Sequence, residues 1–393
     1  MIVHPKMRGF ICTTAHPVGC NMNVRHQAEY ARQHKINGPK RVLVIGSSGG
    51  YGLACRLTAA FSCKADTVGV FFDRPASGSR TATAGWYNNV SFEKLAGQDG
   101  CAFISINGDA YSDEVKKQTI EAIKSLPGGQ VDLVIYSLAA PNRVNPRDGQ
   151  KHSSVIKPVG KSFTGKTVDF HTGQVYETSI SPASEDEIAG TVAVMGGEDW
   201  LFWIEELKKS GSLAPKAATM AFSYIGPTLT HDIYKDGTIG RAKEDLEEKC
   251  TMINSLLAQD GGRAYVAVNK GLVTQASSAI PVVPLYISLI YKLMKEKGSH
   301  EGCIEQMVRL FERVYSGGSQ PNWDSIPVDE KGRIRMDDWE MDDSIQSGLD
   351  KLWAKVSTEN LEELTDIAGY REDFYRMFGF GIKGVDYQAD VEI

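Results

Sequence analysis

A tyrosine and a lysine nine positions apart, Tyr234 and Lys243, are the side chains of this sequence best suited to proton and charge chemistry. A phenol with a pKa of about 10 donates readily to an oxyanion, and a nearby ammonium group lowers that pKa toward neutrality. In one continuous helix the two side chains would lie on opposite faces, at about 100° per residue. Asp236, Gly237 and Gly240 interrupt the helical pattern between them. Tyr234 is therefore predicted in a turn that bends back toward Lys243.

The same residues also have plainer interpretations. Lys243 lies early in a predicted helix, 241–259, where a cation opposes the positive end of the helix dipole, and this favours a role such as binding a ribose hydroxyl. Alternatively, Tyr234 and Lys243 are two surface residues beside a turn. Tyr224, ten positions before Tyr234, is typical of a core residue at a strand end, and His231 is either a proton relay or a solvent-facing histidine.

The stretch from Arg41 to Asp73 carries the elements that would position this chemistry. An apolar run at 42–45 is typical of a strand buried on both faces, and the glycine turn GSSGGYG follows it. A helical segment and a second apolar run then lead to Asp73, which lies 21 residues after Gly52. This is the order of a dinucleotide-binding βαβ unit, in which a helix N-terminus receives the pyrophosphate and an acid roughly 20 residues on binds the ribose. The alternative is a glycine-rich surface loop without a ligand.

Strands and helices alternate along the rest of the chain. Further buried strands are predicted at 102–106, 131–136, 217–222 and 264–268, with helices such as 111–125 and 241–259 between them. The alternation predicts an α/β fold with a Rossmann-type doubly wound parallel sheet, covered by helices on both faces. Because ligands bind at the carboxyl ends of such strands, candidate contacts are Asp109 and Ala110 after the third strand and Leu138 and Ala139 after the fourth.

Two stretches between the strands have a mixed pattern. Residues 74–89 are rich in turn-forming residues and are predicted to form loops, with a short helix starting at Val90. Ser184 and Glu187 match a capping box. They predict the start of one helix that continues through the glycines at 196–197 to the LKKSG sequence.

The chain is predicted to form one large Rossmann-type domain over 1–393. Residues 151–182 show the alternation and turn residues of a small β insertion, which we expect to form part of a cap over the substrate site. From 284 to 393 apolar residues recur at intervals of three and four, which predicts a mainly helical extension packed on the sheet.

Composition narrows the possible functions further. The net charge of -6 argues against a surface for nucleic acid or an anionic membrane. No apolar run approaches the roughly 20 residues that cross a bilayer, and no signal-peptide pattern opens the chain, so a cytoplasmic protein is expected. The seven cysteines are scattered without a C-x-x-C pair and are predicted to be reduced. Cys12, His16 and Cys20 lack a second close pair of ligands, so no metal site is predicted.

Over essentially its whole length the chain resembles the trans-2-enoyl-CoA reductases and the FabV-type enoyl-acyl-carrier-protein (enoyl-ACP) reductases, an extended branch of the short-chain dehydrogenase/reductase superfamily. The motifs that carry the resemblance are GSSGGYG, TAGWYNN at 83–89, YSLAAP at 136–141, VMGGEDW at 194–200, SYIGP at 223–227 and NKGLVTQASSAIPVVPLY at 269–286. Tyr234 and Lys243 form the Y-x8-K motif of this branch, whose spacing is longer than in ordinary short-chain dehydrogenases.

The resemblance implies hydride transfer from NADH to the β-carbon of a 2-enoyl thioester carried by CoA or ACP. Tyr234 and Lys243 would be catalytic, with Tyr234 donating to the thioester oxygen and Lys243 also holding the nicotinamide ribose. Tyr224 would be a second substrate contact. The other implied cofactor-binding residues are Gly46, Ser47, Ser48, Gly49, Gly50, Tyr51, Gly52, Phe72, Asp73, Asp109, Ala110, Leu138, Ala139, Leu272, Val273 and Thr274. No metal is implied, and the protein would be a monomer or a homodimer.

Cofactor choice is predicted from Asp73, whose carboxylate would repel a 2′-phosphate and favour NADH over NADPH. Arg74 and Arg80 could reverse this preference, and the family often has a longer glutamate at the position of Asp73. Two other functions stay open on the sequence alone. One is a carbonyl reductase of 3-oxoacyl thioesters, in which Tyr234 protonates an alkoxide. The other is a dinucleotide-binding sensor or scaffold without reductase activity.

Overall fold

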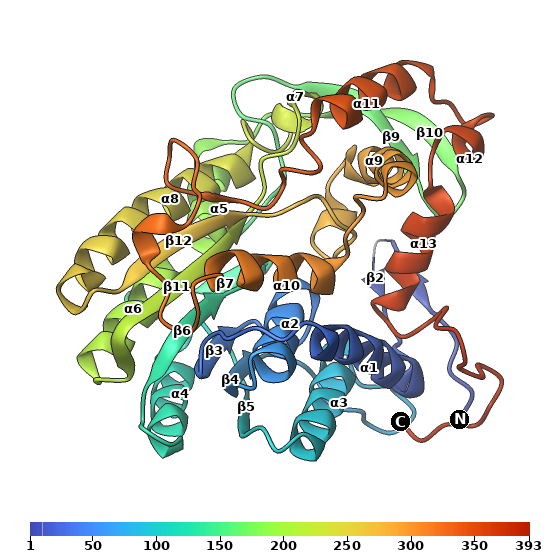
Figure 1. Ribbon diagram of the computed structural model, residues 1–393. Coiled ribbons are helices and arrows are strands. Elements are labelled where there is room, and N and C mark those ends of the chain that lie inside the picture. The colour runs from blue at the N-terminus through green and yellow to red at the C-terminus, as the bar shows by residue number, and fades with distance from the viewer. Residues whose placement is uncertain (10) are drawn as a thin grey trace.

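A parallel sheet forms the centre of the computed structural model, which describes residues 1–9 and 11–393 (Figure 1). Its strand order is β13-β12-β11-β6-β3-β4-β5. The strands are β3 (Arg41–Ile45), β4 (Asp66–Phe71), β5 (Phe103–Asn107), β6 (Val131–Tyr136), β11 (Leu213–Ser223), β12 (Arg263–Val268) and β13 (Ile334–Arg335). The order runs outward from β3 in one direction and from β6 in the other. The predicted Rossmann-type doubly wound fold is therefore confirmed, with its switch point between β3 and β6.

The central strands are apolar on both faces because helices cover both faces. In β3, Val42 and Val44 belong to the core on one side of the sheet, and Leu43 and Ile45 belong to the core on the other side. All four side chains are completely buried. The continuous apolar run at 42–45 thus follows from the two-sided burial that parallel sheets require.

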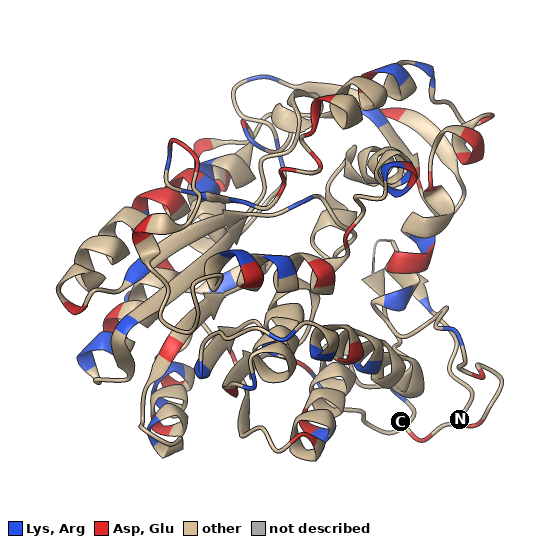
Figure 2. Cartoon of the chain, viewed as in Figure 1, with Lys and Arg blue, Asp and Glu red and all other residues tan. Residues whose placement is uncertain are grey.

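Two layers of helices cover the sheet (Figure 1). One layer contains α1 (Pro17–Gln33), α2 (Gly50–Leu57), α3 (Ala84–Gln98) and α10 (Cys303–Val314). The other contains α4 (Asp113–Ser125), α6 (Glu198–Lys209) and α8 (Thr238–Leu257), with α5 (Glu185–Met195) packed against α8. Acidic and basic residues are interspersed along these outer helices (Figure 2).

A third group of elements lies near the carboxyl ends of the strands and shares one apolar core. Its helices are α7 (Thr228–His231), α9 (Val283–Lys297), α11 (Asp343–Lys355), α12 (Leu361–Leu364) and α13 (Ile367–Arg376). A separate pair, β7 (Asn142–Val144) with β8 (Lys151–Ser153), packs against α5. The strands of the third group form the pairs β1 (Met7–Arg8) with β2 (Ile11–Cys12) and β9 (Phe163–Asp169) with β10 (Gln174–Ile180). The two ends of the chain meet here, because the backbones of Met1 and Val391 exchange hydrogen bonds.

Helix α3 begins at Ala84, so the loop predicted for residues 74–89 is wrong from residue 84 onward. The asparagines at 88 and 89 disfavour helices in isolation, but tertiary contacts override this preference. The Asn88 amide donates to the Ser48 carbonyl at 3.0 Å, and the Asn89 side chain accepts from Arg56 at 2.9 Å. These contacts fasten α3 to the glycine turn and to α2.

The helix predicted from 184 to the LKKSG sequence is divided into α5 and α6 at Gly196 and Gly197. Asp245 of α8 causes the break, since its carboxylate accepts from the Gly197 N–H at 2.8 Å. A Cβ on Gly196 would lie 2.4 Å from the same carboxylate. The capping box of Ser184 and Glu187 at the start of α5 is confirmed.

The residues weighed as a metal site have other roles in the described structure. His16 caps α1, where its Nδ1 accepts from the Gly19 N–H at 3.1 Å. Within residues 1–9 and 11–393, no group of three His, Cys, Asp or Glu side chains is placed to hold a metal ion. In the same part of the chain, no helix is long and apolar enough to cross a bilayer.

Candidate active site

The glycine turn after β3 is folded against the end of β6. Gly46 has a φ of +88°, and a Cβ there would lie 2.0 Å from the Ser137 carbonyl oxygen. A Cβ on Gly52 would lie 1.9 Å from the Gly46 carbonyl oxygen. At Gly49 and Gly50, by contrast, a Cβ would meet no atom within 4 Å. The turn is thus closed toward the sheet and open at the N-terminus of α2, where a pyrophosphate binds in a unit of this kind.

The polar groups around the turn fit such a ligand. The Ser47 hydroxyl is buried and has no partner among the described residues, and Ser48 is held by Asn88 of α3. The Tyr51 hydroxyl donates to the Lys270 carbonyl at 2.8 Å, which connects the turn to the segment after β12. Backbone N–H groups at an open helix start, beside an unpaired hydroxyl, are donors suited to phosphate oxygens.

The predicted adenosine side lies beyond β4. Phe72 directly follows the strand and is 77% exposed. The Asp73 carboxylate accepts from the Thr83 hydroxyl at 2.7 Å, and the Asp73 backbone exchanges two hydrogen bonds with the Asn107 side chain. A Cβ on Gly85 would lie 2.3 Å from the carboxylate, which therefore sits at the start of α3. Helix α3 fixes the direction of Asp73.

Asp109 and Ala110, the other predicted adenosine contacts, rest on a buried ion pair. The Lys116 ammonium lies 2.8 Å from the Asp199 carboxylate, and both side chains are almost fully buried. Lys116 also donates to the Ala110 carbonyl at 3.1 Å. Burial raises the pKa of Asp199, and the Tyr136 hydroxyl donates to its second oxygen at 3.1 Å. Sequence analysis missed this pair, although Asp199 is part of the VMGGEDW motif.

Tyr234 and Lys243 lie on either side of a helix start, as predicted. Tyr234 is in the turn after α7, and α8 begins at Thr238. The turn is tight, because a Cβ on Gly240 would lie 1.7 Å from the Lys235 carbonyl oxygen. The Lys243 ammonium donates to the Phe222 carbonyl at 2.9 Å, at the carboxyl end of β11. The break between the two residues thus brings both to the same edge of the sheet.

The ionisation of the pair differs from the expectation. Burial raises the pKa of the Tyr234 phenol above its ordinary value, and Lys243 does not lower it. Burial also lowers the pKa of Lys243 to about 8. The expected lowering of the Tyr234 pKa is therefore wrong, because loss of hydration on burial disfavours the charged phenolate. Tyr234 stays protonated at neutral pH, as a hydrogen-bond donor requires.

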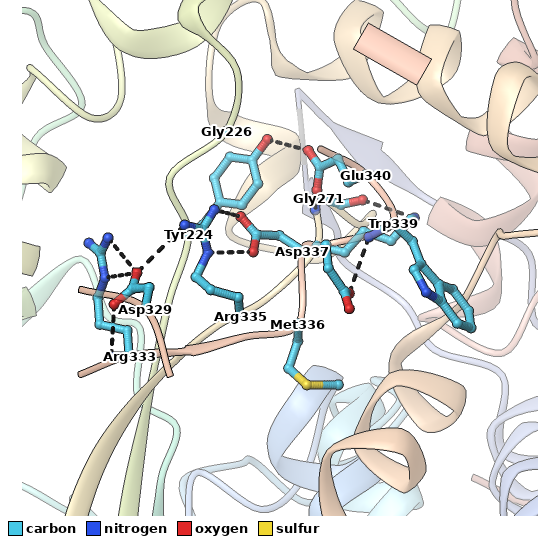
Figure 3. A network of polar contacts seen from close by, with 12 residues as sticks. Tyr224, Gly226, Gly271, Asp329, Arg333, Arg335, Met336, Asp337, Trp339 and Glu340 are labelled. Atoms are coloured by element: carbon cyan, nitrogen blue, oxygen red, sulfur yellow. Dashed lines mark hydrogen bonds and ion pairs between the residues drawn. The ribbon is translucent and has the colours of Figure 1, made fainter. Parts of the chain in front are cut away.

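Tyr224 is packed against Tyr234, with ring centroids 5.1 Å apart and an interplanar angle of 76°. Its hydroxyl donates to the Glu340 carboxylate at 2.9 Å (Figure 3). Among the described residues the Tyr234 hydroxyl has no such partner. The two tyrosines are therefore adjacent but differ in role, since only Tyr234 has a free donor.

The predicted nicotinamide-side residues complete this end of the site. Leu272 and Val273 are buried in the same apolar cluster as Tyr234, with Tyr51 and Tyr224 packed at its margin. Thr274 is held by a reciprocal pair of hydrogen bonds with Ser277. On the other side of the turn, Leu138 is partly buried and Ala139 is exposed, directly after β6.

The predicted residues therefore fall into two groups along one edge of the sheet. Those at the ends of β4 and β5 form the adenosine side, and those at the ends of β11 and β12 form the reaction end. The glycine turn at the switch point lies between them. This is the order of sites expected in a nicotinamide-dependent oxidoreductase, with Tyr234 at the predicted reaction end.

Comparison with known proteins identifies the family. Residues 80–315 match the sequence model of the trans-2-enoyl-CoA reductase catalytic region, and residues 2–78 match that of the NAD(P)H binding domain of trans-2-enoyl-CoA reductase. The chain belongs to the trans-2-enoyl-CoA reductase family, which confirms the resemblance found in the motifs.

Individual relatives cover nearly the whole chain. It is 57% identical over 392 residues to an enoyl-acyl-carrier-protein reductase (NADH) of Flavobacterium johnsoniae, covering 99% of this chain and 97% of the relative. It is 55% identical over 395 residues to a trans-2-enoyl-CoA reductase (NADH) of Ruminiclostridium cellulolyticum, covering 100% of this chain and 98% of the relative. The crystal structure of Clostridium acetobutulicum trans-2-enoyl-CoA reductase in complex with NADH superimposes with a TM-score of 0.95 at 43% identity, covering 100% of this chain and 98% of that one.

Residues 328–391 match a third model, described as an enoyl reductase FAD binding domain. The residues present do not fit a flavin dinucleotide. The N-termini of α11 and α13 are already capped by the carboxylates of Asp342 and Asp366, which repel a pyrophosphate. The chain after β13, residues 336–341, contains no glycine turn. This segment instead extends the sheet through β13 and carries Glu340 to the reaction end.

Proposed function

We propose that this protein reduces the 2,3 double bond of trans-2-enoyl thioesters with NADH. The observation that carries the proposal is the free hydroxyl of Tyr234, held in a buried apolar cluster beside Leu272 and Val273. Reduction of a conjugated thioester places negative charge on the thioester oxygen, and a preorganised donor in a water-poor site stabilises such charge most effectively. The family of the chain and the names of its relatives support the same reaction.

NADH, when bound, supplies the hydride that reaches the β-carbon of the substrate. Tyr234 donates its phenolic hydrogen bond to the thioester oxygen as the enolate forms. Burial keeps the phenol protonated, because the pKa of Tyr234 is raised. Lys243, whose ammonium group donates to the Phe222 carbonyl at the carboxyl end of β11, would hold the nicotinamide ribose. The glycine turn and Ser47 orient the pyrophosphate.

The substrate is a thioester of CoA or of ACP, and the two relatives carry one name of each kind. Both carriers present a pantetheine arm, so the same reaction end serves either. We assign the whole chain to one reductase domain, in which the insertion at 151–182 covers the acyl chain and the segment from 284 to 393 is a helical extension. The Lys166 ammonium of the insertion donates to the Trp353 carbonyl of this extension at 2.9 Å, which supports that arrangement.

The preference for NADH rests on Asp73. Its carboxylate is fixed by Thr83 at the start of α3, where it opposes a 2′-phosphate. Comparison of kcat/KM with NADH and with NADPH tests the assignment. A clear preference for NADPH would overturn it and would assign the 2′-phosphate to Arg74 and Arg80.

The function is tested by the loss of NADH absorbance with crotonyl-CoA as substrate. Turnover of crotonyl-CoA, with no turnover of the matching 3-oxoacyl thioester, is the expected result. Turnover of the 3-oxoacyl thioester alone would identify a carbonyl reductase instead. NADH binding without reduction of either substrate would identify a sensor.

A further inference from the structure

Glu340 is a fully buried carboxylate at the reaction end that the proposed reaction does not use. It lies between β13 and α11 and has no exposed surface. Its Oε1 accepts from the Tyr224 hydroxyl at 2.9 Å and also from the Tyr286 hydroxyl of α9. Its Oε2 accepts from the Gly271 N–H at 2.6 Å. One side chain therefore joins the end of β11, the segment after β12 and the start of α9 (Figure 3).

The backbone around Glu340 is firmly held, which a positioning role requires. On one side, Arg309 of α10 donates to the Met336 carbonyl at 2.7 Å and pairs with Asp338 at 2.8 Å. On the other side, the Gln346 amide of α11 donates to the Glu340 carbonyl at 2.7 Å. The carboxylate thus has little freedom to follow the groups that it binds. Those groups must instead orient toward it.

The three hydrogen bonds have consequences for the site. The Tyr224 proton is committed to Glu340, so Tyr224 cannot donate that proton to the thioester at the same time. The Tyr224 ring, fixed by this bond, is the edge-to-face neighbour of Tyr234 at 5.1 Å. Gly271 directly precedes Leu272 and Val273, which line the nicotinamide side. Glu340 therefore fixes one neighbour of Tyr234 and the start of the segment that faces the cofactor.

We infer that Glu340 is a positioning residue, which orients the Tyr234 donor through Tyr224 and sets the path of the 271–274 backbone. The inference rests on the proposed function, in which Tyr234 serves the thioester oxygen. It assigns Tyr224 a role through its ring, in place of the second hydrogen bond to substrate that the sequence implied. A misplacement of about 1 Å by a residue remote from the chemistry can lower turnover by a factor of about 10².

The test compares Glu340→Gln with Asp337→Asn. The two residues are buried carboxylates of the same segment, but Asp337 pairs with Arg335 at 2.7 Å, and in the described part of the chain its side chain makes no hydrogen bond or ion pair with a residue of the site. For Glu340→Gln we expect a kcat with crotonyl-CoA reduced about tenfold or more, with the Kd for NADH changed less than about twofold. For Asp337→Asn we expect a kcat within about twofold of wild type. A comparable loss of kcat in Asp337→Asn would show a general structural effect and overturn the inference.

A double-mutant cycle with Tyr224→Phe tests whether Glu340 acts through Tyr224. In the Tyr224→Phe background, Glu340→Gln is expected to lower kcat by less than its effect in the wild type. Full multiplication of the two effects would show independent action and overturn the inference.

A readout that does not depend on turnover separates the inference from the proposed function. Hydrogen exchange of the peptide that contains Gly271 is expected to be faster in Glu340→Gln than in wild type and unchanged in Asp337→Asn. Failure of the wild type to reduce crotonyl-CoA would refute the function, whereas unchanged exchange in Glu340→Gln would refute the hold of Glu340 on this segment.

Discussion

The glycine turn and the reaction end perform their tasks with opposite designs. The residues of the turn come from one short stretch of a βαβ unit and leave donors open, since a Cβ on Gly49 or Gly50 would meet no atom within 4 Å. The reaction end is assembled from distant segments: Tyr224 and Glu340 are 116 positions apart, and Tyr51 and Lys270 are 219 apart. Its functional groups are also largely buried.

The difference follows from the ligand chemistry at each end. A pyrophosphate keeps its charge throughout the reaction and needs open N–H groups, which a helix start supplies locally. The enolate oxygen carries charge only during the reaction, and a donor stabilises it best where water is excluded. Exclusion of water requires packing from several segments, so the reaction end depends on the whole fold.

The comparison predicts that turnover and NADH binding can be impaired separately. Tyr234→Phe tests this most strongly. Removal of the Tyr234 hydroxyl is expected to lower kcat by a factor of about 10² to 10³. The Kd for NADH should change little, because Tyr234 lies outside the glycine turn. Stopped-flow reduction of crotonyl-CoA and fluorescence titration with NADH measure the two quantities. An unaltered kcat would remove Tyr234 from the proposed mechanism.

Gly52→Ala changes the glycine turn, where we expect effects on stability and on NADH binding. The new Cβ would lie 1.9 Å from the Gly46 carbonyl oxygen, so the turn must shift. We expect the free energy of unfolding to fall by about 2–3 kcal/mol, together with weaker NADH binding. Gly49→Ala is the matched control, because its Cβ would meet no atom within 4 Å and its unfolding free energy should stay near that of wild type. Equal stability of the two variants in urea would contradict the geometry of the turn.

Lys243 lies at the carboxyl end of β11, and the pH dependence of kcat/KM should reveal its charge. Burial lowers the pKa of Lys243 to about 8, so the residue loses its proton as the pH rises through that value. We expect kcat/KM to fall above about pH 8, by up to tenfold per pH unit. In Lys243→Arg the decline should move to higher pH, since a guanidinium group keeps its charge.

Lys270 provides the control for this profile. Burial lowers the pKa of Lys270 to about 8 as well. Lys270 follows β12 and has no part in the proposed reaction. A Lys270→Met variant that retains folding should keep the decline near pH 8. Disappearance of the decline in this variant would assign it to Lys270 instead.

Lys216 lies in neither the glycine turn nor the reaction end, so its substitution should change stability and leave activity unchanged. It has a φ of +60° in the irregular pairing of β11 with β6, and its side chain is exposed. Lys216→Gly relieves left-handed strain and should raise the free energy of unfolding by about 0.5–1 kcal/mol, with kcat unchanged. Lys117→Gly, within α4 and also exposed, should lower it by about 1 kcal/mol. Urea unfolding of both variants checks the opposite signs.

Much of the fold could be predicted from local patterns. The apolar run at 42–45, the glycine turn and the capping box of Ser184 and Glu187 each carry their signal within a few residues. Predictions failed where a distant partner decided the outcome. Asn88 and Asn89 became helical through contacts with Ser48 and Arg56, and Asp245 divided α5 from α6.

The position of Tyr234 in a turn before the helix of Lys243 was predictable, but the ionisation of the two residues was not. The helix-breaking residues between them showed that the chain must turn. The raised pKa of Tyr234 depends on the surrounding packing, which only the fold supplies. Burial of the phenol sets the direction of the shift.

Local sequence patterns were enough to predict the glycine turn and the alternation of strands and helices along the chain, because the groups that define them are neighbours in sequence. The order of the strands in the sheet joins segments that are distant along the chain, and the fold alone shows it. Only the tertiary structure selected Glu340 from the five acids of MDDWEMDD, which look alike in sequence. Asp337 pairs with Arg335, and Asp338 pairs with Arg309. Glu340 instead accepts hydrogen bonds from two phenols and a backbone N–H. The environment of a carboxylate is a property of what packs around it, and here those groups come from segments 54 to 116 residues away.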